Sequence, residues 1–359
     1  MILAPGCAGR VLVRLPSWLG DVVAVEPAAS ALARAVGEER LSLAAPAHLL
    51  PLLDAWLPRA RRIEHARRGG ERAASWRGHD LAVLFTGSFR SAWTAWRAGI
   101  RTRVGWVRDG RGLFLTHGMS PPFERGGVPI GLGVPGAGRR YLPRPVSTSA
   151  IELVGVLGVP TARTVARLPL VERAVERVER AFGGERGLLL NVGGRAGSAK
   201  AWSVDAWVET CMALAERGAP RPWLVCGPGE EGRLEAIARS LRSQGLDHAL
   251  AFDEAPADLP ELAALCARAA AVVTMDSGPR HVARAVGAPT VTLFGPTDPR
   301  HTLAAGPPER RLRVEVECGP CHREQCLLPE PQAHRCTARL TPESVAQAVL
   351  SLLAADANG

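Results

Sequence analysis

The chain has 359 residues, of which 47% are hydrophobic and 22% charged, and its mean hydropathy is +0.03. This length exceeds what one hydrophobic core usually supports, so we expect two domains. The apolar content excludes an intrinsically disordered chain. No stretch approaches the ~20 apolar residues that span a bilayer, and the first residues lack the basic and apolar regions of a secretory signal. The predicted location is the cytoplasm.

The net charge of +9 is distributed unevenly along the chain. Residues 1–170 carry 23 basic and 11 acidic side chains, whereas residues 171–359 carry 21 and 24. A basic first half attracts polyanions, namely nucleic acid, an anionic membrane surface or a phosphorylated substrate. A solvated, arginine-rich surface is the alternative. Lys200 is the sole lysine among 44 basic residues, which marks it as a candidate functional residue.

Short apolar runs alternate with amphipathic segments through the first half. The apolar runs predict strands, and the alanine-rich segment 22–36 predicts a helix. This alternation is typical of a parallel sheet with helices on both faces. Residues 121–145 are rich in Gly and Pro and predict a long surface loop, most unusual at 126–138. The predicted strands are 10–15, 41–45, 81–85 and 103–106.

The same alternation restarts after an amphipathic helix predicted at 168–186, which ends at a glycine pair. We place the domain boundary at residue 170. The predicted strands are 187–192, 222–226, 271–275 and 290–294, and the predicted helices are 202–217, 230–244, 259–269, 280–286 and 341–355. Thr341 is the predicted N-cap of the last helix, with Pro342 at its first position.

The sequence therefore predicts an α/β protein with two doubly wound domains. The first covers residues 1–170 and the second covers 171–338. A C-terminal helical segment, 339–359, follows them and can return towards the first domain.

Eight cysteines fall into two groups. The first group is isolated along the chain and predicts buried or unreactive thiols. The second group is clustered, with His322 and His334 interleaved. In a reducing compartment such a cluster indicates a tetrahedral zinc site rather than two disulfides, and a loop of reduced thiols without an ion is the alternative. The isolated residues are Cys7, Cys211, Cys226 and Cys266, and the clustered ones are Cys318, Cys321, Cys326 and Cys336.

Ligands of open α/β sheets bind outside the carboxyl ends of the strands, so we searched the loops that follow the predicted strands. The first loop, 16–21, ends at Asp21, which is a candidate general base. The alternative is that Asp21 only caps the next helix.

The second loop, 191–202, is rich in glycine and contains the sole lysine. Such a turn between a strand and a helix can hold a phosphate, although neither the Walker nor the dinucleotide glycine pattern is present. An ordinary exposed turn is the alternative. The candidate residues are Gly193, Gly194, Ser198 and Lys200.

The third loop ends in Glu230, which can bind a ribose diol. The alternative is that it merely suits the positive end of a helix dipole. The fourth loop contains Asp276, Ser277 and Gly278 at a strand end before a helix, where backbone amides form an anion site. Asp276 would repel a phosphate, so we expect it to order the loop or to hold a neighbouring hydroxyl. His281 is a further candidate, with a buried structural histidine as the alternative.

Together these loops resemble the family 9 glycosyltransferases, the ADP-heptose:lipopolysaccharide heptosyltransferases, and most closely the heptosyltransferase II type. The matching segments are PSWLGD (16–21), SFRSAW (88–93), VGWVRDGRGLFLTH (104–117), GSAKAW (197–202), DSGPRHVARAVGAPTVTLFGPTDP (276–299) and CGPCHREQC (318–326). The resemblance implies a GT-B architecture, in which two Rossmann-like domains face each other across a cleft. It also implies that the first domain binds the acceptor and the second the nucleotide sugar.

The resemblance implies an inverting transfer of heptose from ADP-heptose to the lipopolysaccharide inner core, with no required metal or other cofactor. By the same resemblance Asp21 is the general base, Lys200 meets the donor phosphates and Glu230 binds the ribose. The loop 276–278 lies at the pyrophosphate. Two places depart from the family pattern: Pro279-Arg280 follows the loop, and Asn191-Val192 replaces a common Pro-Gly turn.

The basic first half then has a specific interpretation, because the lipopolysaccharide core is anionic and is presented on an anionic membrane leaflet. We expect the protein to lie at the inner face of the cytoplasmic membrane and to bind no nucleic acid. The predicted acceptor-binding residues are Trp18, Ser88, Arg90, Arg108 and Arg111.

Two alternatives are weighed against this interpretation. One is an enzyme of the same fold that uses another nucleotide sugar or acceptor, including a sugar-nucleotide epimerase. The other is a basic nucleic-acid-binding protein with a zinc knuckle at the clustered cysteines. Only 5% of the residues are aromatic and no nucleic-acid-binding motif is present, so the second alternative has little support.

Overall fold

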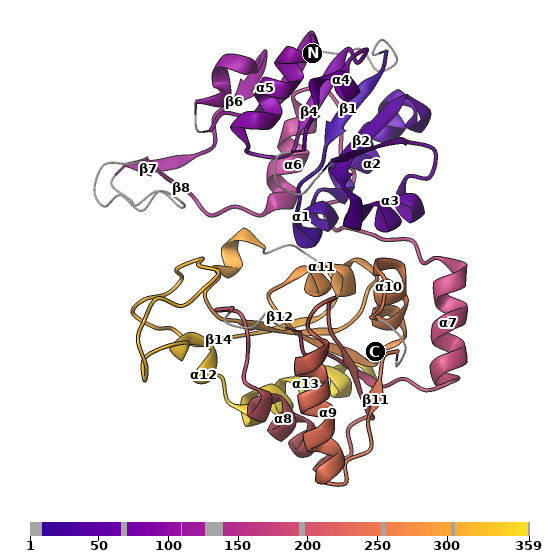
Figure 1. Cartoon of the computed structure of the whole chain (residues 1–359), viewed down its shortest axis with the longest axis vertical. Helices are drawn as coiled ribbons and strands as arrows, with labels where there is room; N and C mark the ends of the chain where they lie inside the picture. Colours follow the sequence, from indigo (N-terminus) through magenta and orange to yellow (C-terminus); the bar gives the residue numbers. More distant parts are fainter. Residues whose placement is uncertain are drawn as a thin grey trace. The chain divides into compact units, whose positions relative to one another are not determined.

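The computed structural model describes residues 9–65, 70–108, 110–125, 139–193, 198–252, 256–302 and 306–357. Contacts between Cα atoms divide the chain into two compact units (Figure 1). The first unit contains Met1–Arg167 and Arg300–Ala305, and the second contains Leu168–Pro299 and Gly306–Gly359. The division after Arg167 falls close to the boundary predicted at residue 170.

The first unit is built on a six-stranded parallel sheet of order β3-β2-β1-β4-β5-β6. Its central strands are buried throughout, which explains their nearly continuous apolar sequences. The strand order reverses between β1 and β4, so the topological switch point lies there. The strands are β1 (Val11–Arg14), β2 (Leu41–Pro46), β3 (Arg61–His65), β4 (Leu81–Leu84), β5 (Thr102–Trp106) and β6 (His117–Met119).

The helix predicted from residue 22 consists of two helices that meet at Val25, α1 (Leu19–Ala24) and α2 (Glu26–Val36). Pro27 lies in the first turn of α2, where its missing amide hydrogen costs no intrahelical bond. The other helices of this unit are α3 (Leu50–Trp56), α4 (Ala73–Trp76), α5 (Phe89–Arg97) and α6 (Val146–Gly155), with short 3-10 turns η1 (Glu38–Arg40), η2 (Ala47–Leu49) and η3 (Arg111–Phe114).

The prediction of one continuous loop at 121–145 is wrong at both ends of that range. There β7 (Phe123–Arg125) and β8 (Arg139–Tyr141) form an antiparallel pair. Neither strand contains Gly or Pro, so each can supply every backbone group that the pairing needs. The Gly/Pro-rich part, 126–138, lies outside the described residues.

The second unit repeats the same topology with the parallel order β11-β10-β9-β12-β13-β14. Its switch point lies between β9 and β12. The predicted pair of doubly wound α/β folds is therefore confirmed. The strands are β9 (Leu188–Asn191), β10 (Pro222–Val225), β11 (Ala249–Leu250), β12 (Ala271–Met275), β13 (Thr290–Phe294) and β14 (Glu309–Arg313).

The helices of the second unit begin and end at recognisable signals. The Oγ1 atom of Thr341 accepts a hydrogen bond of 3.2 Å from the amide of Ser344, which confirms the predicted N-cap. The helix that follows packs against α8 and the strands of this unit, and its return towards the first unit stays a prediction. The helices are α7 (Glu172–Phe182), α8 (Val204–Glu216), α9 (Glu231–Ser243), α10 (Leu259–Arg268), α11 (Gly278–Ala285), α12 (Arg335–Ala338) and α13 (Pro342–Ala357), with the 3-10 turn η4 (Pro299–His301).

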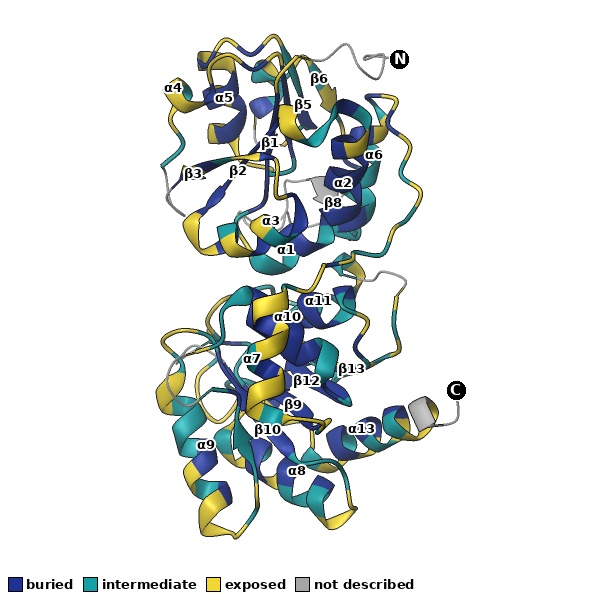
Figure 2. Ribbon diagram, turned by 90° about the vertical axis from the view of Figure 1, so that its right-hand side faces the viewer, coloured by how far each residue is buried: buried dark blue, intermediate teal, exposed yellow. Residues whose placement is uncertain are grey.

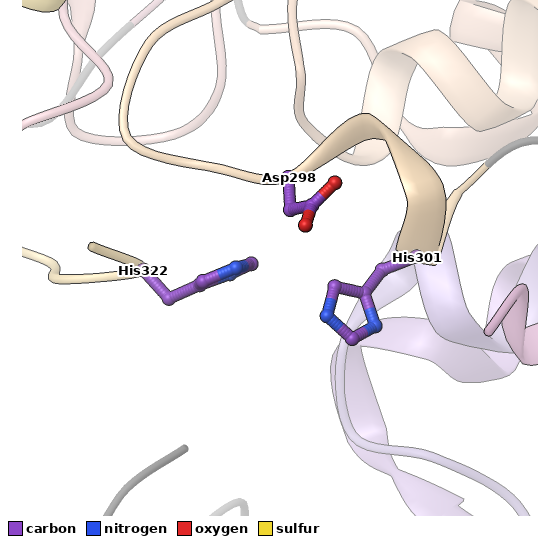
Figure 3. Close-up of side chains that lie close together, drawn as sticks. All are labelled: Asp298, His301 and His322. Carbon is purple, nitrogen blue, oxygen red and sulfur yellow. The ribbon is translucent and has the colours of Figure 1, made fainter. Parts of the chain in front are cut away.

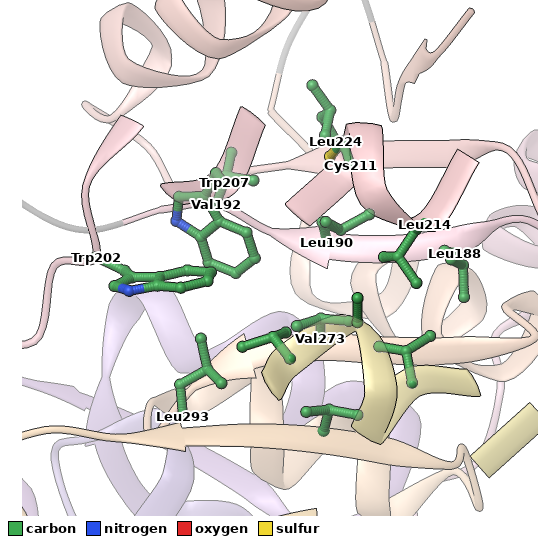
Figure 4. Close-up of a cluster of buried hydrophobic side chains, with 14 of the residues drawn as sticks. Leu188, Leu190, Val192, Trp202, Trp207, Cys211, Leu214, Leu224, Val273 and Leu293 are labelled. Carbon is green, nitrogen blue, oxygen red and sulfur yellow. The ribbon is translucent and has the colours of Figure 1, made fainter. Parts of the chain in front are cut away.

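Hydrophobic side chains from the strands and helices fill the interior of the second unit (Figure 4). The rings of Trp202 and Trp207 meet edge to face with centroids 5.1 Å apart. Cys211, Cys226 and Cys266 are buried, which confirms the prediction for three of the isolated cysteines, while Cys7 lies outside the described residues. Burial raises the pKa of the Cys211 thiol to about 12, so this thiol is unreactive near neutral pH.

The burial pattern follows the layers of each unit: the central strands are buried, and the outer faces of helices such as α7 are exposed (Figure 2). Among the described helices, none combines the length and the apolar character needed to cross a membrane.

Candidate active site

A pocket of about 1060 Å³ opens at the switch point of the first sheet. It lies at the carboxyl ends of β1 and β4, because its walls come from the loops that directly follow these strands. Four residues predicted from the sequence line this pocket together. They are Trp18, Asp21, Ser88 and Arg90.

Asp21 lies in the first turn of α1 and is partly exposed. The N-cap of α1 is Trp18, so the alternative that Asp21 serves as the N-cap is wrong. Trp18 is 56% exposed at the same loop, although an apolar ring of this size is usually covered. The loop therefore presents a carboxylate and an indole ring at the pocket.

A buried ion pair lies beside them, which sequence reasoning missed. The Nε atom of Arg14 lies 2.5 Å from Oε1 of Glu71, and both side chains are about 95% buried. Arg14 also donates to Oγ of Ser17 over 3.2 Å, so it ties the end of β1 to the loop before Asp21. Burial lowers the pKa of Arg14, and the charge of Glu71 opposes this effect. Arg14 is the one charged residue of the otherwise apolar strand β1. This sequence pattern could have marked Arg14 as a candidate site residue.

The position of Arg111 in the structure differs from the prediction that its side chain contacts the acceptor. Its side chain is fully buried and donates to the carbonyl oxygens of Trp106 over 2.8 Å and of Ser88 over 3.1 Å. This burial argues against direct contact with an acceptor, and Arg111 instead supports the loop that carries Ser88. Arg108 is exposed, and its Cδ lies 3.5 Å from the position that a Cβ atom on the pocket residue Gly87 would take.

In the second unit, the loops after β9 and β12 meet at the switch point. The Nζ atom of Lys200 donates to the carbonyl oxygen of Asp276 over 2.9 Å. Ser198 supports the same turn, because its Oγ accepts from the amide of Lys200 over 3.2 Å. Asn191 joins the two strands through a bond of 3.1 Å from its Nδ2 to Oγ1 of Thr274. The fold thus brings together the predicted residues Ser198, Lys200 and Asp276.

Glu230 lies against the glycine turn after β9. Its Oε2 accepts from the amide of Gly227 over 3.0 Å, and it does not cap α9 with its side chain. A Cβ atom at Gly193 would lie only 2.2 Å from this Oε2, so a side chain at that position would displace the Glu230 carboxylate. The predicted residue Gly194 lies outside the described residues.

Asp276 is held by a buried ionic network. Arg280, 1% exposed, donates from Nη1 to Oδ1 of Asp276 over 3.1 Å and from Nε to Oε1 of Glu309 over 2.8 Å. Arg284 contacts the other oxygen of Glu309 at 2.9 Å. Burial alone would raise the pKa of Glu309, but the two arginines hold it below its usual value. Asp276 therefore orders its loop, as predicted, with its charge balanced by Arg280.

The rest of the fourth loop begins α11. This helix starts at Gly278, and Ser277 precedes it as an N-cap whose hydroxyl donates instead to the carbonyl oxygen of Met275 over 3.2 Å. Burial, followed by the charge of Arg280, lowers the pKa of His281 to about 4. His281 is therefore neutral at pH 7, where its ring offers one donor and one acceptor.

Three of the clustered cysteines lie in the segment between β14 and α12, and Cys336 lies in α12. Cys318 and Cys321 are exposed, Cys326 is half-buried and Cys336 is buried. The pKa of Cys336 is raised by burial and then by the charges of the other three thiols, which therefore lie near it. Within the described residues, the four sulfur atoms do not form a group of three or more ligand atoms lying within 4.8 Å of one another.

The cysteine segment also pairs with the lysine turn. Ser198 and Gln325 form an isolated antiparallel bridge, and the amide of Ala199 donates to the carbonyl oxygen of Glu324 over 2.8 Å. The residues between Cys321 and Cys326 therefore support the backbone that precedes Lys200. Sequence reasoning treated these two regions separately, because no local signal links them.

Asp298 and His322 lie close together at a further place in the second unit, with potential ligand atoms within 4.8 Å of each other (Figure 3). His301, the third side chain drawn there, belongs to the segment Arg300–Ala305 that clusters with the first unit.

The chain is similar to known proteins over its whole length. The family model described as glycosyltransferase family 9 (heptosyltransferase) matches residues 142–331. Lipopolysaccharide heptosyltransferase 1 of Pseudomonas aeruginosa is 27% identical over 96% of this chain and 98% of its own length. Lipopolysaccharide heptosyltransferase 2 of Escherichia coli K12 is 24% identical over 85% of this chain and 88% of its own.

Solved structures show the same fold. The E. coli ADP-heptose lipopolysaccharide heptosyltransferase II superimposes with a TM-score of 0.70 at 23% identity, covering 97% of this chain and 99% of the other. The E. coli heptosyltransferase WaaC with ADP-2-deoxy-2-fluoro heptose superimposes with a TM-score of 0.67 at 19% identity, covering 95% of this chain and 99% of the other. The predicted GT-B fold is confirmed by these likenesses.

Proposed function

The chain belongs to the glycosyltransferase family 9 heptosyltransferases, and from this premise we propose that it transfers a heptose from ADP-heptose to the inner core of a lipopolysaccharide. The observation that carries the proposal is that each sheet gathers the predicted polar residues at its switch point. Asp21 lines the pocket of the first unit, and Lys200 contacts Asp276 in the second. Relatives named for this transfer match nearly the full chain.

In the proposed reaction, Asp21 acts as general base. It takes the proton from an acceptor hydroxyl while that oxygen forms a bond to the anomeric carbon of the donor. The bond from this carbon to the diphosphate oxygen breaks, and ADP leaves with the electron pair. A single displacement of this kind inverts the configuration at the anomeric carbon. The partly exposed position of Asp21 in the pocket suits contact with an acceptor.

Lys200 and the first amides of α11 are assigned to the charge that develops on the departing diphosphate. The ammonium of Lys200 is held at the carbonyl of Asp276, next to the start of that helix. We assign Glu230 to the ribose diol, because its carboxylate lies beside the glycine turn. Lys200 and the first amides of α11 supply positive charge where a divalent ion otherwise would, so we propose that the reaction requires no metal.

The heptosyltransferase II type remains part of the proposal. It is supported by the quoted segments of the sequence, while the relatives named above include types 1 and 2. In this type the attacking hydroxyl belongs to a heptose that the acceptor already carries. A matched pair of acceptors, one without heptose and one with a single heptose, therefore separates the types.

Mass spectrometry of the acceptor after incubation with ADP-heptose tests the proposed function. We expect the acceptor with one heptose to gain one more, and Asp21→Asn to suppress this gain. Asp54→Asn is the matched control, because Asp54 is an exposed carboxylate of the same unit that pairs with Arg62. Transfer only to the acceptor without heptose would overturn the type, and transfer only from another nucleotide sugar would overturn the donor.

We also retain a structural zinc ion at Cys318, Cys321, Cys326 and Cys336 as a proposal. Four thiols in one segment suit the tetrahedral thiolate chemistry of zinc. Metal analysis of protein purified without chelator should give one zinc per chain, reduced by Cys336→Ser and kept by the matched variant Cys226→Ser. A stoichiometry near zero in the unaltered protein would end this proposal.

A further inference from the structure

Large apolar side chains gather on the outer face of α5 and the neighbouring η3. The exposed fractions are 46% for Phe89, 36% for Trp93, 51% for Trp96 and 87% for Leu113. The ring of Phe114 joins them, with its centroid 5.2 Å from that of Phe89 and 5.5 Å from that of Trp96. We call these five residues the α5 patch.

The orientation of α5 is the reverse of that expected for a surface helix. A surface helix usually turns its large apolar residues towards the core. Here the buried positions carry small residues, and both tryptophans point outward. Among the large hydrophobic side chains that are exposed in the described residues, four belong to the α5 patch. The buried positions of α5 are Ser91, Ala92, Thr94 and Ala95.

Arginines lie close to the α5 patch. Residues 86–117 contain six arginines and one acidic residue, Asp109. The guanidinium of Arg97 lies 4.8 Å from the ring centroid of Trp93, so charge and aromatic surface are adjacent. The exposed arginines of this region are Arg90, Arg97, Arg101 and Arg108.

From this combination we propose that the α5 patch docks onto the surface of an anionic lipid bilayer. Tryptophan rings favour the boundary between headgroups and acyl chains, and arginines are attracted to anionic headgroups. A second copy of this chain is a poorer occupant of the patch, because the exposed arginines of the two copies would repel each other. The exposed aromatic face and its charge thus point to the same partner.

The α5 patch continues into the pocket of the first unit, since Phe89 and Arg90 also line that pocket with Asp21. Docking would place the pocket at the lipid surface, where an acceptor can enter without leaving the bilayer. This step rests on the proposed function, because it assumes an acceptor with a lipid anchor. The binding of lipid itself does not depend on that function.

Co-sedimentation of the full chain with vesicles tests the inference. We expect binding to vesicles of phosphatidylethanolamine and phosphatidylglycerol, and much less binding to phosphatidylcholine alone. The double variant Trp96→Ser/Leu113→Ser should lower the bound-to-free ratio about tenfold. The double variant Arg97→Gln/Arg101→Gln should also lower it about tenfold and remove the preference for anionic lipid.

Leu327→Ser is the matched control, because Leu327 is an apolar side chain of the second unit that is 67% exposed. It should bind vesicles like the unaltered protein. Thermal unfolding checks that each variant is folded. The single variant Leu113→Ser tests the patch at a side chain that packs little against the rest of the protein. Absence of binding by the unaltered protein, or equal binding by the patch variants, would overturn the inference.

Heptose transfer to a water-soluble acceptor without acyl chains separates this inference from the proposed function. We expect the patch variants to keep that transfer while they lose vesicle binding and transfer to acceptor embedded in vesicles. Vesicle binding without any transfer would overturn the proposed function alone. Transfer to the soluble acceptor without vesicle binding would overturn the docking surface alone.

Discussion

The two units share one strand order but hold their polar groups in different ways. At the switch point of the first sheet, Trp18 before α1 and Arg90 in the first turn of α5 are exposed, and Asp21 is partly exposed in a wide pocket. At the switch point of the second, Lys200 is fixed to the backbone of Asp276, whose carboxylate is buried against Arg280. The topology therefore sets the place of each site, and the loops set its chemistry.

This difference suits two kinds of ligand. A pocket of about 1060 Å³ with exposed cationic and aromatic side chains can adapt to a large anionic acceptor. A small cluster with fixed hydrogen bonds is preorganised for a diphosphate, which it must hold in one position while charge develops. We expect changes in the first site to affect acceptor chemistry, and changes in the second to affect nucleotide binding and stability.

The largest expected effect comes from Asp21→Asn. Loss of the general base should reduce kcat by ~10²–10⁴, with little change in donor affinity. Steady-state kinetics combined with calorimetric titration of ADP would measure both quantities. The contradicting result is a loss of ADP affinity at unchanged kcat, because it would move Asp21 into the donor site.

The next effect should come from Arg280→Leu, which leaves the carboxylates of Asp276 and Glu309 facing each other without their shared partner. Breaking a buried pair in this way costs about 3–5 kcal/mol of unfolding free energy, measurable by denaturant unfolding. The unbalanced carboxylate of Asp276 should also weaken ADP binding, measurable by calorimetric titration.

Arg284→Leu is the control for this prediction, because Arg284 contacts the other carboxylate oxygen of Glu309. It should lower stability without weakening ADP binding. An equal loss of ADP affinity in both variants would show that the charge balance of Asp276 has no special effect on the donor site.

A smaller effect should appear in the acid stability of the second unit. The pKa of His281 is lowered from 6.5 to about 4. Between these pH values, the ring of His281 is protonated in the unfolded chain but neutral in the folded chain. Stability should therefore fall as the pH drops from 6.5 towards 4, by at most about 1.4 kcal/mol per pH unit from this group. Denaturant unfolding of His281→Gln should show a shallower slope in that window. An unchanged slope would contradict the burial of a neutral ring.

The smallest effect should come from Arg90→Gln/Arg108→Gln. Two exposed arginines near the pocket should raise the KM for an anionic acceptor a few-fold and reduce its salt dependence, with little change in the KM for ADP-heptose. Arg59→Gln is the control, because Arg59 is an exposed arginine of the same unit that does not line the pocket. An unaltered acceptor KM and salt dependence would remove these arginines from the acceptor site.

Sequence reasoning found the central strands because burial on both faces demands continuous apolar runs, as in β9 and β12. It missed β3, β6, β11 and β14, which lie at the edges of the two sheets. Edge strands are partly exposed, so they tolerate charges such as those of β14 that hide the strand pattern.

The sites show the same limit. Asp21 and Lys200 were found because each lies in the short segment after a buried strand, and Lys200 is also the only lysine in the sequence. Glu71 lies far along the chain from its partner Arg14, so its ion pair could not be seen without the fold. Arg111 was predicted to bind the acceptor with the other arginines of the basic first half, and only the fold shows the backbone carbonyls that surround its guanidinium.

The central claim is that the second unit binds the ADP part of the donor through Lys200. Calorimetric titration of the full chain with ADP, UDP, GDP and CDP tests this claim most directly, repeated with Lys200→Ala. We predict a preference for ADP that the variant loses. A preference for UDP, or equal ADP binding with and without Lys200, would contradict it.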